Sequence, residues 1–267
     1  HYLPLGLNSK IPKKMTSIAV SIADKVDTLV GFFGINEIPT SSKDPFALRR
    51  SAFGLLRIII ENDLSIQLRD LMNYSSVLYT EQRFKFSNQS TFINLLNFLR
   101  ARIKNYLKEK KIRHDIIDAA IASHTSDNFV SLYKKSLILN KYLDKDLGKN
   151  ILMTYKRASN ILDQERKNIN LKITGEPDHI LFNKDEEKLL FDEIKEVRKY
   201  FSTSIKNENY EKTLEILSGT KKTTDNFFEN VVVNDENKNI KKNRLELLEM
   251  FCKTYDNFID FSKVEGA

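Results

Sequence analysis

Apolar residues recur along most of the chain at intervals of three or four positions, which is the period of an amphipathic α-helix. No segment sustains the apolar–polar alternation of a β-strand beside the residues of a hairpin turn, so the pattern predicts an all-α protein. A polar break at Asp144 to Gly148 suggests a domain boundary near residue 147, giving domains 1–147 and 148–267. We expect helices near residues 13–33, 44–59, 64–80, 88–111, 114–123, 127–142, 149–167, 184–202, 208–217, 222–232 and 240–262.

The second predicted helix has a clear start signal at Asp44-Pro45. Asp44 is suited to cap free backbone N–H groups, and Pro45 loses no hydrogen bond at a first helical position. Behind this start, one face is apolar from Leu48 to Ile59. Another face gathers three cations, Arg49, Arg50 and Arg57.

The predicted helix at 88–111 also has two different faces. Its apolar face runs from Phe92 to Leu107 and is expected to be buried. Its cations recur at i, i+4, i+8 and i+11, so we expect one basic stripe formed by Arg100, Lys104, Lys108 and Lys111.

Charge is concentrated in the first part of the chain. The net charge is +7, but residues 1–150 carry 23 basic and 14 acidic side chains whereas residues 151–267 carry 20 and 22. A basic surface of this kind favours a polyanionic partner such as nucleic acid. The alternative is a base-composition effect, because Lys, Asn and Ile are abundant everywhere.

The remaining composition excludes several classes of protein. Apolar residues make up 41% of the chain and charged residues 30%, which is typical of a globular, water-soluble protein. No apolar run reaches the roughly 18 to 20 residues of a membrane span. The single Cys252 forbids an internal disulfide and fits a reducing, cytosolic compartment. Since the chain begins at His1 rather than Met, we expect a portion of a longer polypeptide.

Three short motifs resemble sites of catalysis but lack the parts that the chemistry needs. Lys14 to Ser17 and Gly31 to Gly34 have no preceding strand and no phosphate-binding glycine loop. His114-Asp115 has the dipeptide of metal-dependent phosphohydrolases, although a helix start is its usual explanation. Asp24 and Asp27 lie three apart on an otherwise apolar helix and are interpreted either as local capping or ion-pairing groups or as the remnant of a metal or phosphate site.

The second domain has one face suited to RNA. Between Leu152 and Leu162 the apolar residues share one side of the predicted helix, which leaves Lys156, Arg157 and Asn160 on the other. Cations bind phosphates and Asn can read a base edge in an unstacked loop, although a solvated helix face has the same pattern.

These segments together carry a resemblance to a known family. Residues 1–4 (His-Tyr-Leu-Pro), 22–35 (Ile-Ala-Asp-Lys-Val-Asp-Thr-Leu-Val-Gly-Phe-Phe-Gly-Ile) and 43–50 (Lys-Asp-Pro-Phe-Ala-Leu-Arg-Arg) are similar to the β subunit of bacterial heterotetrameric glycyl-tRNA synthetase. Residues 156–162, 227–233 and 243–245 extend the similarity, in the style of the helical anticodon-binding domain of class I synthetases. The resemblance covers almost the whole chain and implies its C-terminal portion.

The resemblance implies the end of an HD-type helical domain followed by a helical-bundle anticodon-binding domain. It implies a part of glycine-tRNA ligase that holds glycine tRNA for ATP-dependent glycylation by a separate α subunit. ATP and Mg²⁺ would bind at the α subunit and none at this chain, which would not be catalytic alone. The complete enzyme would be a cytoplasmic heterotetramer of two α and two β subunits, with no membrane contact.

The resemblance also gives the candidate residues a role. Asp24 matches the terminal Asp of the HD motif, but the earlier motif members would precede residue 1, so the metal site is incomplete. Two alternatives stay open: a metal-dependent phosphohydrolase of the HD type, and a structural module that docks the α subunit without contacting tRNA. For the anticodon region we expect Lys156, Arg157, Asn160 and Arg244, and for the tRNA backbone Arg49, Arg50, Arg57, Arg100, Lys104, Lys108 and Lys111.

Overall fold

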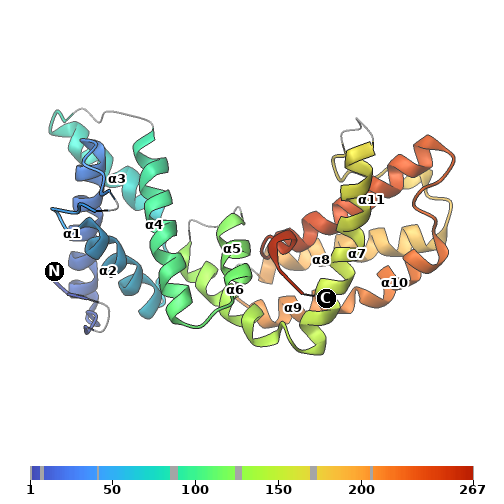
Figure 1. Cartoon of the computed structure of the whole chain (residues 1–267), viewed down its shortest axis with the longest axis horizontal. Helices are drawn as coiled ribbons and strands as arrows, with labels where there is room; N and C mark the ends of the chain where they lie inside the picture. Colours follow the sequence, from blue (N-terminus) through green and yellow to red (C-terminus); the bar gives the residue numbers. More distant parts are fainter. Residues whose placement is uncertain are drawn as a thin grey trace. The chain divides into compact units, whose positions relative to one another are not determined.

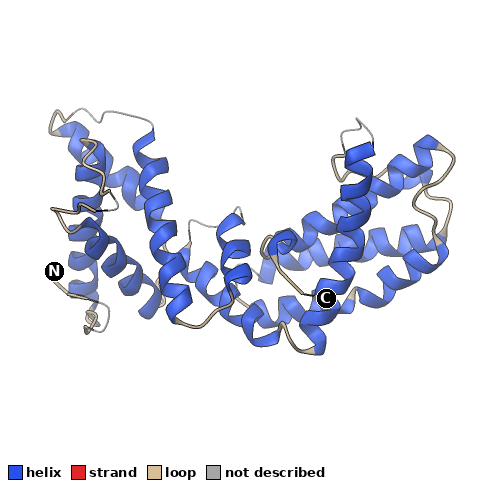
Figure 2. Cartoon of the chain, viewed as in Figure 1, coloured by secondary structure: helices blue, strands red, loops and turns tan. Residues whose placement is uncertain are grey.

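The computed structural model describes residues 2–6, 9–40, 42–84, 90–123, 128–168, 173–204 and 207–266. Within these ranges the chain forms eleven α-helices and two short 3-10 helices, and no strand (Figures 1 and 2). The predicted all-α fold is therefore confirmed. None of the helices in these ranges is long and apolar enough to cross a lipid bilayer.

Every helix predicted from the periodicity is present, and the ends differ by a few residues. The predicted starts at residues 88 and 127 lie outside the described residues. Elsewhere the largest differences are at the starts of the second and third helices and at the end of the last one, which is followed by a separate 3-10 turn. The α-helices are α1 (Met15–Gly34), α2 (Leu48–Glu61), α3 (Leu68–Glu81), α4 (Ser90–Glu109), α5 (His114–Ala122), α6 (Phe129–Tyr142), α7 (Asp146–Asn168), α8 (Asp185–Ser204), α9 (Tyr210–Gly219), α10 (Lys221–Asn230) and α11 (Lys238–Asp256), with 3-10 helices η1 (His179–Leu181) and η2 (Phe261–Lys263).

The chain divides into two compact units. The first contains residues 1–112 and 125–133, and the second contains residues 113–124 and 134–267. The second unit thus begins before the predicted boundary near residue 147. It includes α5 and most of α6, because α5 packs against η2 and Lys135 of α6 donates a hydrogen bond to the carbonyl of Asn257. The limits of the functional domains stay a prediction.

Helix α1 is the centre of the first unit and contacts α2, α3 and α4. Ile22, Val26, Leu29, Val30 and Phe33 are buried at helical spacing along it. This spacing places them on a continuous apolar face, and their burial supplies much of the hydrophobic stabilisation of this unit.

The start of α2 corrects one prediction. Asp44 does cap the helix, because its carboxylate accepts the backbone N–H groups of Leu48 at 2.8 Å and Arg49 at 3.1 Å. Pro45, however, is not the first helical residue. Ala47 has a left-handed backbone (φ 52°), and the helix begins only at Leu48. The residues between Asp44 and Leu48 form a turn that folds the carboxylate back onto the free N–H groups.

Helices α7 and α11 form the centre of the second unit, with α8, α9 and α10 packed around them (Figure 1). Five aromatic rings join this centre to η2, with neighbouring ring centroids 4.5 to 6.3 Å apart. Such pairs add about 0.5 to 1.5 kcal/mol each beyond the apolar area that they bury. The rings belong to Tyr155, Phe251, Tyr255, Phe258 and Phe261.

The loop before η1 is held against α11 by two polar side chains. The Glu246 carboxylate accepts the N–H groups of Thr174 at 2.6 Å and of Glu176 at 3.3 Å. The Asn243 side chain exchanges two hydrogen bonds with the backbone of Asp178, at 2.7 and 2.9 Å. Gly175 has φ +79° and lies against Glu249, where an added Cβ would be strained and crowded.

Candidate nucleic-acid interface

Helix α7 has the two faces that its sequence predicts. Tyr155 and Ala158 are buried, whereas Arg157 and Asn160 are exposed and Lys156 is half-buried. The structure therefore brings the three predicted polar residues to one surface, on a helix whose opposite side forms the core of the second unit.

Arg157 is positioned but still accessible. Its guanidinium lies 4.4 Å from the centroid of the Phe228 ring of α10 and 3.9 Å from an oxygen of Asp225, and its side chain is 48% exposed. An exposed ion pair of this length contributes little to stability, so a phosphate is free to compete with Asp225 for the guanidinium. Lys156 donates from Nζ to the carbonyl oxygen of Gly266.

Arg244 does not lie on this surface. Its side chain is 4% exposed and donates to Glu187 Oε1, to Asp235 Oδ2 and to the carbonyl oxygen of Val232, each at 2.7 Å. A further donor reaches Asn183 Oδ1 at 2.8 Å. Each of the three guanidinium nitrogens thus donates to an acceptor inside the second unit, and the contacts support a structural role in place of the predicted contact with RNA.

The three arginines of α2 also differ in their exposure to solvent. Arg50 is exposed and Arg49 half-buried, but Arg57 is buried. Arg57 makes a two-pronged ion pair with Glu61, with Nε 2.7 Å from Oε1, and donates to the carbonyl of Gly6 at 2.8 Å. These contacts assign Arg57 to the fold, because its donors point away from solvent.

The predicted stripe on α4 is shorter than expected. Arg100 and Lys104 are half-buried and Lys108 is exposed. Helix α4 ends at Glu109, and Lys111 follows with a left-handed backbone (φ 59°). Lys111 is exposed beyond the helix, so only the first three cations share its face.

Arg102 was not among the binding residues predicted from the sequence. With Arg49 and Arg50 this arginine lines a cleft of about 440 Å³ in the first unit, together with Gly6, Phe53 and Asn105. The available signal was the i, i+3 spacing of Arg102 and Asn105 on α4, which lies outside the i+4 stripe.

A second cleft, of about 1180 Å³, is unsuited to a polyanion. It lies in the second unit between α8 and α10, and its charged lining consists of Lys221, Lys222 and five acids, Asp192, Glu193, Glu196, Asp225 and Glu229. Burial raises the pKa of the Glu193 carboxyl, while a hydrogen bond from Thr223 opposes this change. Five carboxyl groups against two ammonium groups would repel a phosphate backbone.

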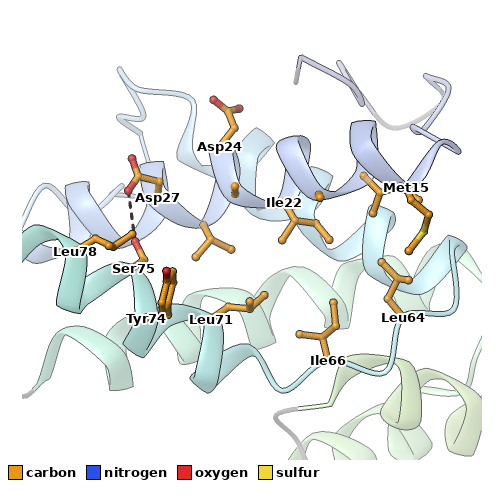
Figure 3. Close-up of a pocket in the computed structure, with 14 residues that line it drawn as sticks. Met15, Ile22, Asp24, Asp27, Leu64, Ile66, Leu71, Tyr74, Ser75 and Leu78 are labelled. Atoms are coloured by element: carbon orange, nitrogen blue, oxygen red, sulfur yellow. Dashed lines mark hydrogen bonds between the residues drawn. The ribbon is translucent and has the colours of Figure 1, made fainter.

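The first unit also contains an apolar groove of about 740 Å³ between α1 and α3 (Figure 3). Met15, Ile22, Leu71 and Leu78 are among the side chains that line it. In Figure 3 the Asp24 carboxylate points away from these apolar side chains. Such a surface is typical of a contact with another polypeptide and is unlike a phosphate site.

The candidate metal residues are not assembled into a centre. In the parts of the chain that the structure describes, no group of three or more His, Cys, Asp or Glu side chains is placed to hold a metal ion. Although burial acts to raise the pKa of Asp115, hydrogen bonds from Arg113 and from the N–H of Glu265 lower it below its ordinary value. His114 is exposed at the first residue of α5, so the dipeptide marks a helix start.

Two family models match the chain. The model described as glycyl-tRNA synthetase beta subunit matches residues 1–122, and the model described as DALR anticodon binding domain matches residues 151–264. The first match covers most of the first unit, and the second lies inside the second unit.

Curated relatives agree along the whole chain. The glycine–tRNA ligase beta subunit of Ruegeria sp. (strain TM1040) is 35% identical over 266 residues, which is 100% of this chain and 37% of that protein. The protein of the same name from Rickettsia canadensis (strain McKiel) is 38% identical over 265 residues, or 99% of this chain and 38% of its own length. The chain thus spans little more than a third of the length of these relatives. With both models and both relatives in agreement, the chain belongs to the glycyl-tRNA synthetase β-subunit family.

Proposed function

We propose that this chain is the tRNA-binding part of a glycine-tRNA ligase β subunit. In this proposal it holds glycine tRNA, including the anticodon region, while a separate α subunit carries out the ATP-dependent glycylation. The observation that carries the proposal is the position on α7 of the half-buried Lys156 and the exposed Arg157 and Asn160, inside the segment that matches an anticodon-binding domain.

The anticodon surface would combine three kinds of contact. Arg157 would bind phosphate oxygens, because its guanidinium is exposed and only weakly paired with Asp225. Asn160 would donate to and accept from a base edge in an unstacked loop. Lys156 would add a less directional charge. Arg244 would act indirectly, by fixing α11 to the first turn of α8 through Glu187 and to the residues before α8 through Asn183.

A division of labour between subunits follows from the proposal. Glycine activation, ATP and Mg²⁺ belong to the α subunit, and this chain supplies no catalytic group. The complete enzyme would contain two α and two β subunits and act in the cytoplasm. The printed names of the relatives, each a beta subunit, support a partner subunit.

One observation favours a second role beside tRNA binding. The apolar groove between α1 and α3 is a protein-contact surface in character, which supports docking of another polypeptide on the first unit. Docking alone, without tRNA contact, is the rival proposal. A phosphohydrolase of the HD type gains no support, because Asp24 is not joined by further metal-ligating side chains in the described residues.

The test is a binding titration of the chain against glycine tRNA and against the same tRNA with a substituted anticodon, each at two salt concentrations. We expect binding that weakens with salt and again with the altered anticodon. The double variant Lys156→Ala/Arg157→Ala should weaken binding about tenfold and reduce the salt slope by about 1 to 2.

Lys188→Ala is the control for charge, because Lys188 is an exposed cation of α8 whose Nζ lies 3.2 Å from Oδ1 of the exposed Asp185. It should leave affinity within about twofold of the parent. If the double variant binds like this control, α7 is not the RNA surface. If the parent chain binds no tRNA at all, the docking role is the better account.

A further inference from the structure

The cleft between α2 and α4 has an unusual set of side chains. Arg49, Arg50 and Phe53 come from the first two turns of α2, and Arg102 and Asn105 from the middle of α4. The two helices pack against each other within the first unit (Figure 1). Three guanidinium groups, one carboxamide and one aromatic ring therefore converge on a space of about 440 Å³.

Several of these side chains are held in place before any ligand binds. The Arg102 guanidinium stacks over the Phe98 ring, with 4.2 Å between Cζ and the ring centroid. Arg49 donates to the carbonyl of Thr40 and lies 3.7 Å from an oxygen of Asp44. The Phe53 ring contacts the Tyr106 ring edge-on at 6.0 Å. Groups already fixed in this way lose little conformational entropy when a ligand arrives.

The charges in the cleft are not balanced. Asp44 is the acid beside Arg49, and its carboxylate already accepts the N–H groups of Leu48 and Arg49. Burial lowers the pKa of the Arg102 guanidinium, and the nearby charge of Arg49 lowers it further, against an opposing contribution from Asp44. Cations brought together in this way repel each other, and an anion placed between them relieves the repulsion.

The shape of the donors selects the anion. Guanidinium groups present planar pairs of N–H donors that match phosphate oxygens. Phe53 offers a ring on which a base can stack, and Asn105 offers a donor and an acceptor for a base or a ribose. Arg50 is exposed at the edge, where it would meet the next phosphate of a passing strand.

We infer that this cleft binds a phosphodiester of an RNA strand, with Arg49 and Arg102 on one phosphate and Arg50 on its neighbour. The inference rests on the proposed tRNA-binding function and adds to it a defined site in the first unit. This site differs from the stripe on α4. At about 100° per residue, Arg102 is about 160° from Arg100 around the helix axis, whereas Lys104 is only about 40° away.

The test uses the whole chain, a short mixed-sequence RNA oligonucleotide and glycine tRNA as separate probes. We expect Arg50→Ala/Arg102→Ala to weaken oligonucleotide binding at least tenfold and to reduce the magnitude of its salt slope by about 2. Arg102→Lys keeps the positive charge and loses the planar pair of N–H donors. It should weaken oligonucleotide binding about threefold to fivefold. Thermal melting by circular dichroism checks that each variant folds.

The matched control is Lys14→Ala/Lys188→Ala, which removes two exposed charges, one from each unit. Lys14 is well separated from the cleft, because the adjacent Lys13 donates to the carbonyl of Glu61 at the far end of α2, about 17 Å along the helix from Arg50. The control should change oligonucleotide affinity by less than about twofold.

The outcomes separate the site from the wider function. Equal oligonucleotide affinity for the parent and the Arg50→Ala/Arg102→Ala variant, or no oligonucleotide binding by either, would overturn the cleft even if tRNA still binds through α7. Oligonucleotide binding that depends on the cleft, without tRNA affinity, would support the site and contradict the proposed function. Competition by inorganic phosphate at the same phosphate concentration as the oligonucleotide would indicate a small-anion site and overturn the assignment to RNA.

Discussion

Arginines in two regions of this molecule have the same charge and opposite surroundings. Arg244 of α11 is enclosed by two carboxylates and two further oxygen acceptors in the second unit. In the first unit, Arg49, Arg50 and Arg102 share a cleft, and Asp44 is the one neighbouring carboxylate found among the described residues. The comparison teaches that the number of acceptors around a guanidinium decides whether it stabilises the fold or is available to a ligand.

The largest effect should follow from Arg244→Met. Removing the guanidinium leaves the Glu187 carboxylate, whose side chain is fully buried, without its cation. Breaking a buried ion pair from one side costs about 3 to 5 kcal/mol of the free energy of unfolding. Urea denaturation followed by circular dichroism would measure this loss.

A double variant isolates the ion pair from the other contacts. Arg244→Met/Glu187→Leu should recover a large part of the stability, because it leaves no uncompensated charge. Arg157→Ala, at an exposed arginine of the same unit, should change stability by less than about 0.5 kcal/mol. A loss below about 1 kcal/mol for Arg244→Met would contradict the distinction between the two environments.

Asp256 is the reverse case, a half-buried carboxyl without a cation among the groups that set its pKa. Burial raises this pKa to about 6, and the nearby acids Asp260 and Glu249 also raise it, while hydrogen bonds from Tyr155 and the N–H of Phe261 oppose the change. Because the folded-state pKa is above the unfolded one, the stabilising contribution is complete below about pH 4 and is lost as the pH rises through 6.

The corresponding prediction compares the parent with Asp256→Asn, which keeps an oxygen to accept the N–H of Phe261. Between pH 4 and pH 8 the parent should lose about 1 to 3 kcal/mol relative to this variant. Urea denaturation across that range measures the difference. Parallel pH profiles for the two proteins would show that Asp256 does not titrate as described.

Arg57→Ala should change the free energy of unfolding less than Arg244→Met does, and less than the pH-dependent change that Asp256 is expected to cause. Arg57 bonds to the partly exposed Glu61 and to the carbonyl of Gly6, so its loss frees one chain segment and leaves no deeply buried charge. We expect a loss of about 1 to 2 kcal/mol in the free energy of unfolding. Because Gly6 lines the cleft, RNA affinity should also fall slightly. A fall in affinity as large as that of Arg50→Ala/Arg102→Ala would show that Arg57 itself contacts RNA.

The helical fold was predictable because apolar spacing is a local property of the sequence. The face of α7 shows this well, since Tyr155 and Ala158 are buried and Arg157 is exposed as their spacing predicts. Capping by Asp44 was also predictable, although the turn through Ala47 was not. A left-handed alanine depends on how the carboxylate folds back, and helical periodicity carries no information about that.

Whether an individual cation is buried or exposed could not be predicted from the pattern of one helix alone. Arg244 and Arg157 both lie on amphipathic helices, but Glu187, 57 residues away in sequence, is what buries Arg244. The cleft likewise depends on two helices, since Arg49 and Arg102 are separated by more than 50 positions and meet only through packing. Periodicity identifies which residues face outward, and tertiary partners decide which of these stay free.

The smallest effect should come from Lys108→Ala, which tests whether charge alone explains RNA binding in the first unit. Lys108 is exposed in the last turn of α4, on the stripe and away from the cleft. Its loss should reduce RNA affinity by no more than about twofold to threefold, because it removes one charge without a fixed geometry. It should reduce the free energy of unfolding by about 0.3 to 0.5 kcal/mol through the helix dipole. The oligonucleotide titration used for Arg102→Lys measures the binding. A larger effect at Lys108 than at Arg102 would mean that RNA follows the stripe, and that convergence of three guanidinium groups is not what makes the first unit bind.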